Sequence, residues 1–89
     1  MQRVFRTNPA IIWKLVHEEA VLLNPANGEY FGLNEVGSEI WKNIDGKKTL
    51  AEIGALLLAE YDVAPTVLEE DMLELIGELL KKGLIQETT

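Results

Sequence analysis

The chain has 89 residues, of which 47% are hydrophobic and 26% charged, with a formal net charge of −7. This composition is typical of a globular protein, and the length predicts one domain covering residues 1–89. The absence of cysteine excludes disulfides, thiolate nucleophiles and Cys-ligated metals, and a single histidine, His17, excludes catalytic triads and multi-histidine metal sites. We therefore expect a binding protein that is not an enzyme and that uses no cofactor or metal.

The distribution of charge argues against nucleic acid and membrane partners. Arg3, Arg6 and Lys14 are the only Lys or Arg residues before Glu18, whereas every charged side chain from residue 60 to residue 78 is acidic. Phosphate binding depends on clustered Lys and Arg, which this half of the chain lacks. The sequence also shows neither an apolar run of about 18 residues nor a signal peptide. We expect a cytoplasmic protein that binds neither nucleic acid nor membranes.

The first third of the chain predicts three short strands. Residues 11–16, 20–23 and 29–33 are rich in β-branched and aromatic types. A polar break at residues 17–19 separates the first two, and a turn ending in Asn27-Gly28 separates the second from the third. Because Asn-Gly readily accepts positive φ, this turn favours a hairpin. We interpret the segment as a three-stranded antiparallel meander.

From Asn34 onward the apolar spacing becomes helical. Asn34 is a good N-cap for a first helix, which we expect to end at Asp45-Gly46. Thr49 and Glu52 have the spacing of a capping box for a second helix that ends near Tyr61. The first of these helices is short.

A third and longer helix follows Pro65. Thr66 and Glu69 form another capping box, and Lys82-Gly83 supplies the stop. The apolar arc of this helix spans about 160°, against the ~100° that a surface helix needs. Either the helix is buried from two directions, or one flank is open for a partner. Leu84-Ile85 either adds a short strand or returns to the core.

Strands followed by helices predict an α+β fold, winged-helix-like, with an N-terminal three-stranded antiparallel sheet over about residues 11–33 and three helices over about residues 34–83. The run of residues 21–63 followed by 69–85 resembles the PqqD-like family, the RiPP recognition elements that bind precursor peptides in ribosomal natural-product biosynthesis. The matching features are Leu33-Asn34, Gly37 with Ile40-Trp41, Asp45-Gly46, the segment 49–53, Tyr61-Asp62-Val63, Asp71, and Leu79 with Gly83-Leu84-Ile85.

Within this family, the YFGLNEVG stretch of residues 30–37 most resembles the stand-alone recognition proteins of lasso-peptide clusters. The resemblance implies that the chain, as a monomer without a catalytic domain, holds the leader segment of a precursor peptide as an added β-strand. It further implies delivery of the leader to a separate leader peptidase, a cysteine protease. A PqqD-type role in pyrroloquinoline quinone biosynthesis ranks second, and a winged-helix DNA-binding protein is disfavoured by the acidic last helix.

The place of binding follows from strand and helix chemistry. An edge strand offers unpaired backbone groups to an extended peptide, and a neighbouring helix with an over-wide apolar arc supplies the wall of a groove. We place the groove between the third strand and the last helix. The predicted peptide-binding residues are Tyr30, Phe31, Gly32 and Leu33 on the strand and Val67, Leu68, Asp71, Met72, Leu75 and Glu78 on the helix.

Each of these residues also has a structural interpretation. Phe31 and Leu33 share one face of the strand and suit a core between sheet and helix. Gly32 suits either the close approach of a peptide backbone or a β-bulge. Asp71 and Glu78 either pair with basic groups or backbone donors of the leader, or belong to a solvated helix face.

Overall fold

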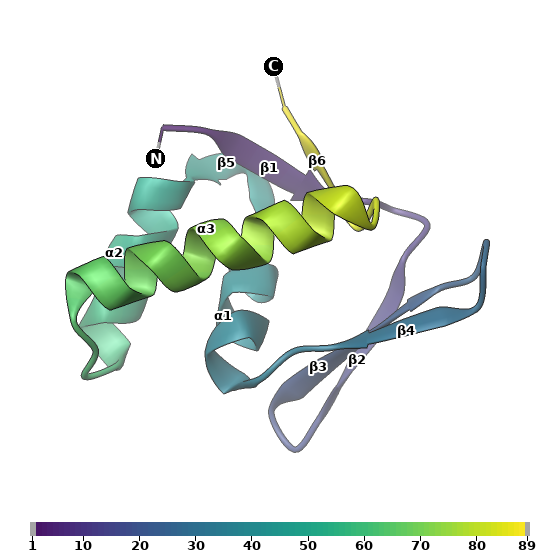
Figure 1. Ribbon diagram of the computed structural model, residues 1–89, viewed down its shortest axis with the longest axis horizontal. Helices are drawn as coiled ribbons and strands as arrows, with labels where there is room; N and C mark the ends of the chain where they lie inside the picture. Colours follow the sequence, from purple (N-terminus) through teal and green to yellow (C-terminus); the bar gives the residue numbers. More distant parts are fainter. Residues whose placement is uncertain (1, 89) are drawn as a thin grey trace.

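The computed structural model describes residues 2–88, which form two three-stranded antiparallel sheets and three helices (Figure 1). In chain order the elements are β1 (Val4–Thr7), β2 (Ile12–Val16), β3 (Glu19–Asn24), β4 (Glu29–Gly32), α1 (Glu35–Asn43), β5 (Asp45–Thr49), α2 (Leu50–Glu60), α3 (Pro65–Lys81) and β6 (Ile85–Glu87). In Figure 1, α3 crosses in front of α1 and α2, and the β2–β3–β4 sheet projects to one side. The predicted α+β, winged-helix-like class is confirmed.

The predicted meander is the β2–β3–β4 sheet. Leu22 in the central strand pairs with Trp13 of β2 and with Phe31 of β4. The first turn uses two residues with positive φ, His17 at 52° and Glu18 at 68°, which matches the right-handed twist of a two-residue hairpin. The second turn uses Gly28, with φ of 72°.

The second sheet, in the order β5–β1–β6, was not predicted as such. β1 lies at its centre and pairs antiparallel with both neighbours, for example Phe5 with Glu87 of β6. Of the two alternatives for Leu84-Ile85, a short strand or a return to the core, the structure shows the strand, which begins at Ile85.

The expected end of α1 is wrong. The helix stops at Asn43, and Ile44 is already extended. Gly46, with φ of 78°, lies inside β5 and does not cap the helix. The chain therefore leaves α1 early because residues 45–49 pair with β1.

Two of the three predicted helix starts are confirmed. The Asn34 side chain accepts a hydrogen bond from the Gly37 N–H at 2.8 Å, and Thr49 and Glu52 form the reciprocal capping box of α2. The capping box predicted at Thr66 is wrong, because α3 begins at Pro65 with Ala64 as an N-cap that makes no side-chain bond. Proline presets a helical φ at the first helical position, so Thr66 already lies inside the first turn.

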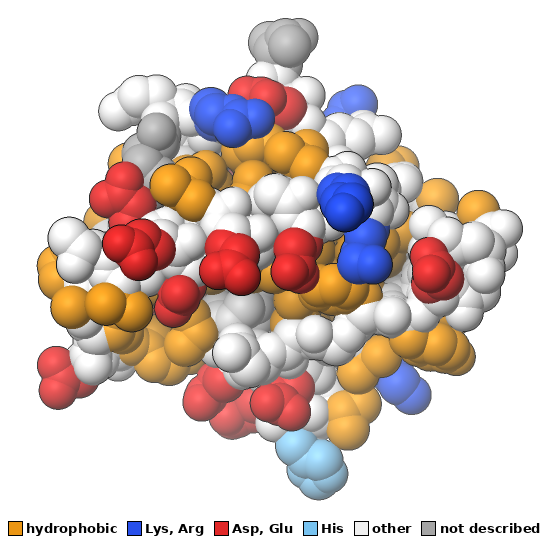
Figure 2. Space-filling model, viewed as in Figure 1, with side chains coloured by type: hydrophobic (Ala, Val, Ile, Leu, Met, Phe, Trp, Pro, Cys, Tyr) orange, Lys and Arg blue, Asp and Glu red, His pale blue; other side chains and the backbone are white. Residues whose placement is uncertain are grey.

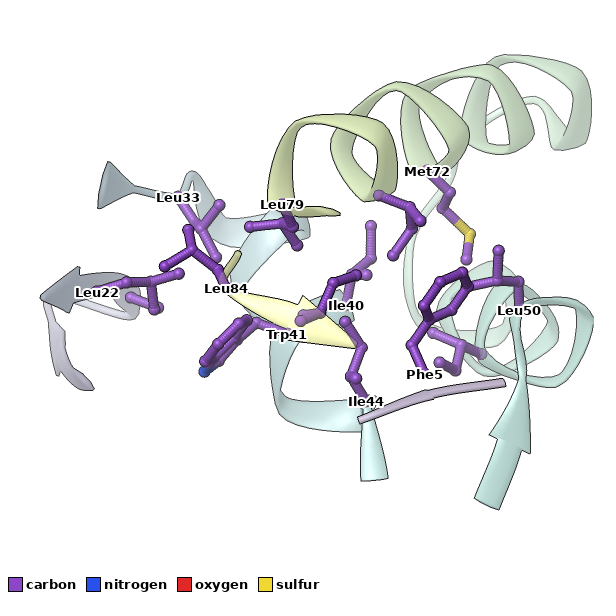
Figure 3. Close-up of a cluster of buried hydrophobic side chains, with 14 of the residues drawn as sticks. Phe5, Leu22, Leu33, Ile40, Trp41, Ile44, Leu50, Met72, Leu79 and Leu84 are labelled. Atoms are coloured by element: carbon purple, nitrogen blue, oxygen red, sulfur yellow. The ribbon is translucent and has the colours of Figure 1, made fainter. Parts of the chain in front are cut away.

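The core draws side chains from the helices and from both sheets. Figure 3 shows Leu79 of α3, Ile40 of α1 and Leu22 of β3 pointing into the same interior. Trp41 is also buried, and its ring meets Trp13 edge to face with the centroids 6.1 Å apart. The helices and the β2–β3–β4 sheet are therefore held by one shared core.

The wide apolar arc of α3 is only partly used by this core. Its buried side chains are Leu68, Met72, Ile76 and Leu79. Val67 remains 51% exposed on one flank and Leu73 remains 45% exposed. Apolar surface therefore stays exposed on both sides of the buried stripe of α3.

Candidate functional site: a groove between β4 and α3

The outer edge of β4 carries no neighbouring strand in the part of the chain that the structure describes. Leu33, just after β4, donates its N–H to the carbonyl of Ala20 in β3 at 2.9 Å. Because backbone groups alternate in direction along an antiparallel strand, those of Phe31 also point toward β3. The N–H and C=O groups of Tyr30 and Gly32 consequently point away from β3, where an added strand can reach them.

A groove of about 500 Å³ lies between this edge and α3. One wall comes from β4 and the residues after it, the other from α3, and α1 contributes buried residues beneath. The lining residues are Phe31, Gly32, Leu33, Asn34, Val36, Gly37, Ile40, Val63, Val67, Leu68, Asp71, Glu74, Leu75 and Glu78.

Hydrogen bonds at Ser38 hold the sheet against the start of α1. The buried Ser38 hydroxyl accepts from the Ala20 N–H at 2.6 Å and donates to the Asn34 carbonyl at 2.7 Å. The carbonyl of the same Ala20 accepts the hydrogen bond from Leu33, just after β4. One buried hydroxyl thus fixes the receiving edge relative to the floor of the groove.

Gly37 lets α1 approach α3 closely at this floor. A Cβ at this position would lie 3.1 Å from Asn34 Oδ1 and 3.6 Å from Leu75 Cδ2. A Cβ here would therefore crowd the N-cap oxygen of α1 while only reaching ordinary contact distance from Leu75 on the helix wall.

The apolar part of the groove is accessible to a ligand. Val67 is half exposed, Leu75 and Phe31 are half buried, and Leu68 is buried. The Lys82 ammonium lies 5.7 Å from the centroid of the Phe31 ring, a cation–π contact at the C-terminal end of α3. An extended peptide with apolar side chains fits such a surface.

Carboxylates follow the α3 side of the groove. Asp71, Glu74 and Glu78 are exposed and line it. Figure 2 shows acidic side chains in a row along α3, with basic side chains beyond one end of the row. The groove thus combines apolar surface, a strand edge and negative charge.

The structure brings most of the predicted site residues together. Phe31, Gly32, Leu33, Val67, Leu68, Asp71, Leu75 and Glu78 all line the groove. Their part in peptide binding stays a prediction. The sequence periodicity predicted that these residues of β4 and α3 lie close together, and in the structure they do.

Met72 and Tyr30 lie elsewhere. Met72 is fully buried, and its sulfur lies 3.5 Å from where a Cβ on Gly54 would be, so it packs against α2. The expectation that Met72 lines the groove is therefore wrong. Tyr30 is 71% exposed and, being one residue from Phe31, projects from the opposite face of β4.

Sequence reasoning missed the floor and one acidic residue of the groove. The missed lining residues are Asn34, Val36, Gly37, Ile40, Val63 and Glu74. Val36 and Ile40 were visible as the apolar stripe of α1, but periodicity does not tell which helix lies beneath a groove. Glu74 could have been found, because it lies three residues after Asp71 on the same helix face.

Neither a metal-ligand cluster nor a membrane-spanning helix is found among residues 2–88. Between residues 2 and 88, no three His, Asp or Glu side chains are grouped so that they could hold a metal ion. Over the same residues, no helix is both long enough and apolar enough to cross a bilayer.

The family comparison covers most of the chain. The family described as coenzyme PQQ synthesis protein D (PqqD) matches residues 19–85. A curated relative, the bifunctional coenzyme PQQ synthesis protein C/D of Methylorubrum extorquens, is 30% identical over 71 residues. That match takes in 80% of this chain but spans only 18% of the relative's length.

Solved structures give a closer match in size. TbiB1 in complex with the TbiA(beta) leader peptide has a TM-score of 0.81 and 33% identity, over 91% of this chain and 94% of that one. A lasso peptide synthetase B1 complexed with the leader peptide has a TM-score of 0.81 and 29% identity, over 92% and 96%. The heterocyclase TruD is 16% identical, with a TM-score of 0.65, and the match covers 97% of this chain and 12% of the TruD chain. This likeness shows a shared fold alone. Because the family match spans well over half of its residues, the chain belongs to the PqqD family.

Proposed function

We propose that this protein binds the leader segment of a ribosomally made precursor peptide of the lasso type. The leader lies in the groove as a fourth strand of the β2–β3–β4 sheet, between β4 and α3. The observation that carries this proposal is the outward-facing edge of β4 beside an apolar groove of about 500 Å³. The two similar structures that contain leader peptides support it.

The energetics suit such a binder. Each ladder hydrogen bond at the edge contributes about 0.5–1.5 kcal/mol net, and because these bonds involve only backbone they give affinity without sequence preference. Side chains of the leader that point toward α3 meet Val67, Leu68 and Leu75, which add apolar burial and selectivity.

Binding is tested with the leader peptide encoded beside this gene. Isothermal calorimetry or fluorescence anisotropy should give a dissociation constant between nanomolar and micromolar. A leader that shows no binding at protein concentrations well above micromolar would contradict the proposal.

The strand placement needs its own experiment. A series of leader peptides, each N-methylated at one backbone amide, removes one N–H at a time while keeping every side chain. If the leader pairs with Tyr30 and Gly32, methylation should weaken binding at alternate positions only, because alternate amides face β4. Equal sensitivity at successive positions, or none, would place the leader elsewhere.

We further propose that the protein is not itself a catalyst and that it works in the cytoplasm, delivering the bound leader to a separate cysteine protease. The lack of cysteine and the single histidine support a role without covalent chemistry. Precursor cleavage by that protease should be faster with this protein than without it, and the protein alone should cleave nothing. Equal cleavage rates with and without the protein would refute delivery.

A second candidate is the corresponding role in coenzyme PQQ biosynthesis. The family description and the relative from Methylorubrum extorquens favour it. The same groove would then bind the precursor peptide of that pathway. Parallel titrations with a lasso leader and with a PQQ precursor peptide separate the two, because the true ligand should bind at least tenfold more tightly.

A further inference from the structure

We propose that Asp71, Glu74 and Glu78 make the groove selective for extended peptides in which Lys or Arg side chains are interleaved with apolar ones. This inference rests on the proposed function, since it takes the occupant to be a strand added at β4. It goes beyond that function by assigning a charge requirement to the peptide.

The three carboxylates form one row, which we call the acidic row. They are three and four residues apart on α3, so they share a helix face. At a rise of about 1.5 Å per residue, the row extends roughly 10 Å along the helix. Same-face side chains of a strand repeat about every 6.6–6.8 Å, so two of them fit alongside the row.

Within residues 2–88, no ion pair reaches the acidic row. The ion pairs found within residues 2–88 are Arg3–Glu87, Lys42–Glu39 and Lys48–Asp45, and none involves α3. Lys82, one turn beyond Glu78, lies over the Phe31 ring. The row therefore keeps its negative charge for a ligand.

Repulsion within the row adds to this preference. Carboxylates at i, i+3 and i, i+4 spacing on a helix destabilise it, and a basic side chain placed between them relieves the repulsion. A groove with apolar walls also concentrates the field of charges that line it, so the attraction exceeds that at an open surface.

The apolar residues of the groove explain why the peptide must also carry apolar side chains. Val67, Leu68 and Leu75 lie on the same side of the groove as the acidic row. A peptide with basic residues alone would leave this surface unfilled, whereas a purely apolar peptide would leave the carboxylates unpaired. Both kinds of side chain are needed for full contact.

Exposed carboxylates outside the groove, two on α3 and one at the end of α2, offer a matched control. Glu69 and Glu70 are exposed on α3 but do not line the groove, and Glu60 is exposed at the end of α2. The triple variant D71N/E74Q/E78Q and the triple variant E60Q/E69Q/E70Q remove the same total charge. Any difference between them reports position and not net charge.

The test is a selection from a random library of twelve-residue peptides displayed on phage, with the full-length protein as bait. Peptides selected by the wild-type protein and by E60Q/E69Q/E70Q should be enriched in Lys and Arg beside apolar residues, relative to the unselected library. Peptides selected by D71N/E74Q/E78Q should keep the apolar preference and lose the basic one.

Affinity then checks the selected sequences. One enriched peptide should bind D71N/E74Q/E78Q about tenfold more weakly than the wild type in dilute buffer, and the difference should shrink at high salt because exposed charges are screened. E60Q/E69Q/E70Q should bind within twofold of the wild type.

The outcomes separate this inference from the proposed function. Enrichment of apolar peptides without any gain in Lys or Arg overturns the charge requirement and leaves peptide binding standing. Equal loss of basic preference in both triple variants also overturns it, because net charge would then be the cause. Failure to enrich any peptide counts against both the inference and the proposed function.

Discussion

The two three-stranded sheets have the same antiparallel pairing but differ in how much of their strands is exposed. In the β5–β1–β6 sheet the central strand is paired on both sides, and it supplies Phe5 to the core. In the β2–β3–β4 sheet every residue of β2 is exposed, and β4 leaves one edge free beside the groove. The first sheet joins distant parts of the chain, while the second presents surface.

Exposure along the strands shows the same contrast. Ile12, Leu15 and Tyr30 in the second sheet are 60%, 45% and 71% exposed, although large apolar side chains normally favour burial. Phe5 in the first sheet is 2% exposed. The outer strands of the second sheet therefore keep apolar side chains at the surface, whereas its central strand β3 joins the core through Ala20 and Leu22, as β1 does through Phe5.

The largest expected effect is on stability in the first sheet. Phe5→Ala should lower the free energy of unfolding by about 3–5 kcal/mol, because it leaves a cavity in the core. Leu15→Ala, in the second sheet, should cost less than about 1 kcal/mol because that side chain is already half exposed. Chemical denaturation followed by circular dichroism measures both; equal losses would contradict the contrast between the buried side chain on β1 and the exposed one on β2.

The next effect concerns the wall of the groove. Val67→Lys should weaken leader binding tenfold or more, because it replaces an apolar contact with a charge that must be desolvated. Leu73→Lys is the matched control, since Leu73 has similar exposure on the same helix but does not line the groove. Calorimetry should find Leu73→Lys close to the wild type. If Leu73→Lys is the more damaging variant, the groove has been placed on the wrong flank of α3.

A smaller effect is expected at the strand edge. Gly32→Pro removes one outward N–H, and proline is tolerated at an edge where the N–H does not join the sheet. Loss of one ladder bond should weaken leader binding about two- to tenfold, with the circular dichroism spectrum preserved. Unchanged affinity in a folded Gly32→Pro protein would argue against pairing at this residue.

The smallest effect is the response of the first sheet to acid. The hydrogen bond from Arg3 lowers the pKa of Glu87, and hydrogen bonds from the Lys48 side chain and from the Lys48 and Lys47 N–H groups lower the pKa of Asp45. In the folded protein the pKa of Glu87 lies below its ordinary value of 4.5, and that of Asp45 lies below its ordinary value of 3.8. The stabilisation from each carboxylate is therefore complete at pH values above its ordinary pKa. It is lost as the pH falls through its folded-state pKa. Titration of Glu87 and Asp45 should thus leave the denaturant concentration at the unfolding midpoint unchanged near pH 6. It should lower this midpoint below about pH 4.

Arg3→Gln isolates the part due to Glu87. This variant should lose less stability on acidification than the wild type, since Glu87 no longer has its strongest partner. The difference should be small because both groups are exposed to solvent. Identical pH profiles would show that the pair contributes nothing to stability.

Local signals explain which parts of the fold could be predicted. The β2–β3–β4 meander and the starts of α1 and α2 were predictable because alternation, turn residues and caps act over a few residues. β5 was not, since its sequence DGKKT has no strand character and it is extended only because β1 pairs with it. Pairing between residues 39 to 45 positions apart leaves no local pattern.

The groove likewise has parts that the local sequence predicts and parts that depend on tertiary packing. Its two walls were predictable from the strand edge and the over-wide arc of α3, because each is a property of one element. The place of Met72 was not, because it lies within the arc and only the packing of α2 shows that this part faces the core. The α1 floor at Val36 and Ile40 likewise depends on how three elements pack together.

The central claim is that the leader adds a strand to the edge of β4, and amide hydrogen exchange by NMR tests it most directly. With saturating leader peptide, exchange should slow strongly at the Tyr30 and Gly32 amides, which face away from β3. The β1 amides, in the other sheet, should exchange as before. If the Tyr30 and Gly32 amides exchange equally fast with and without bound leader, the peptide does not pair with this edge.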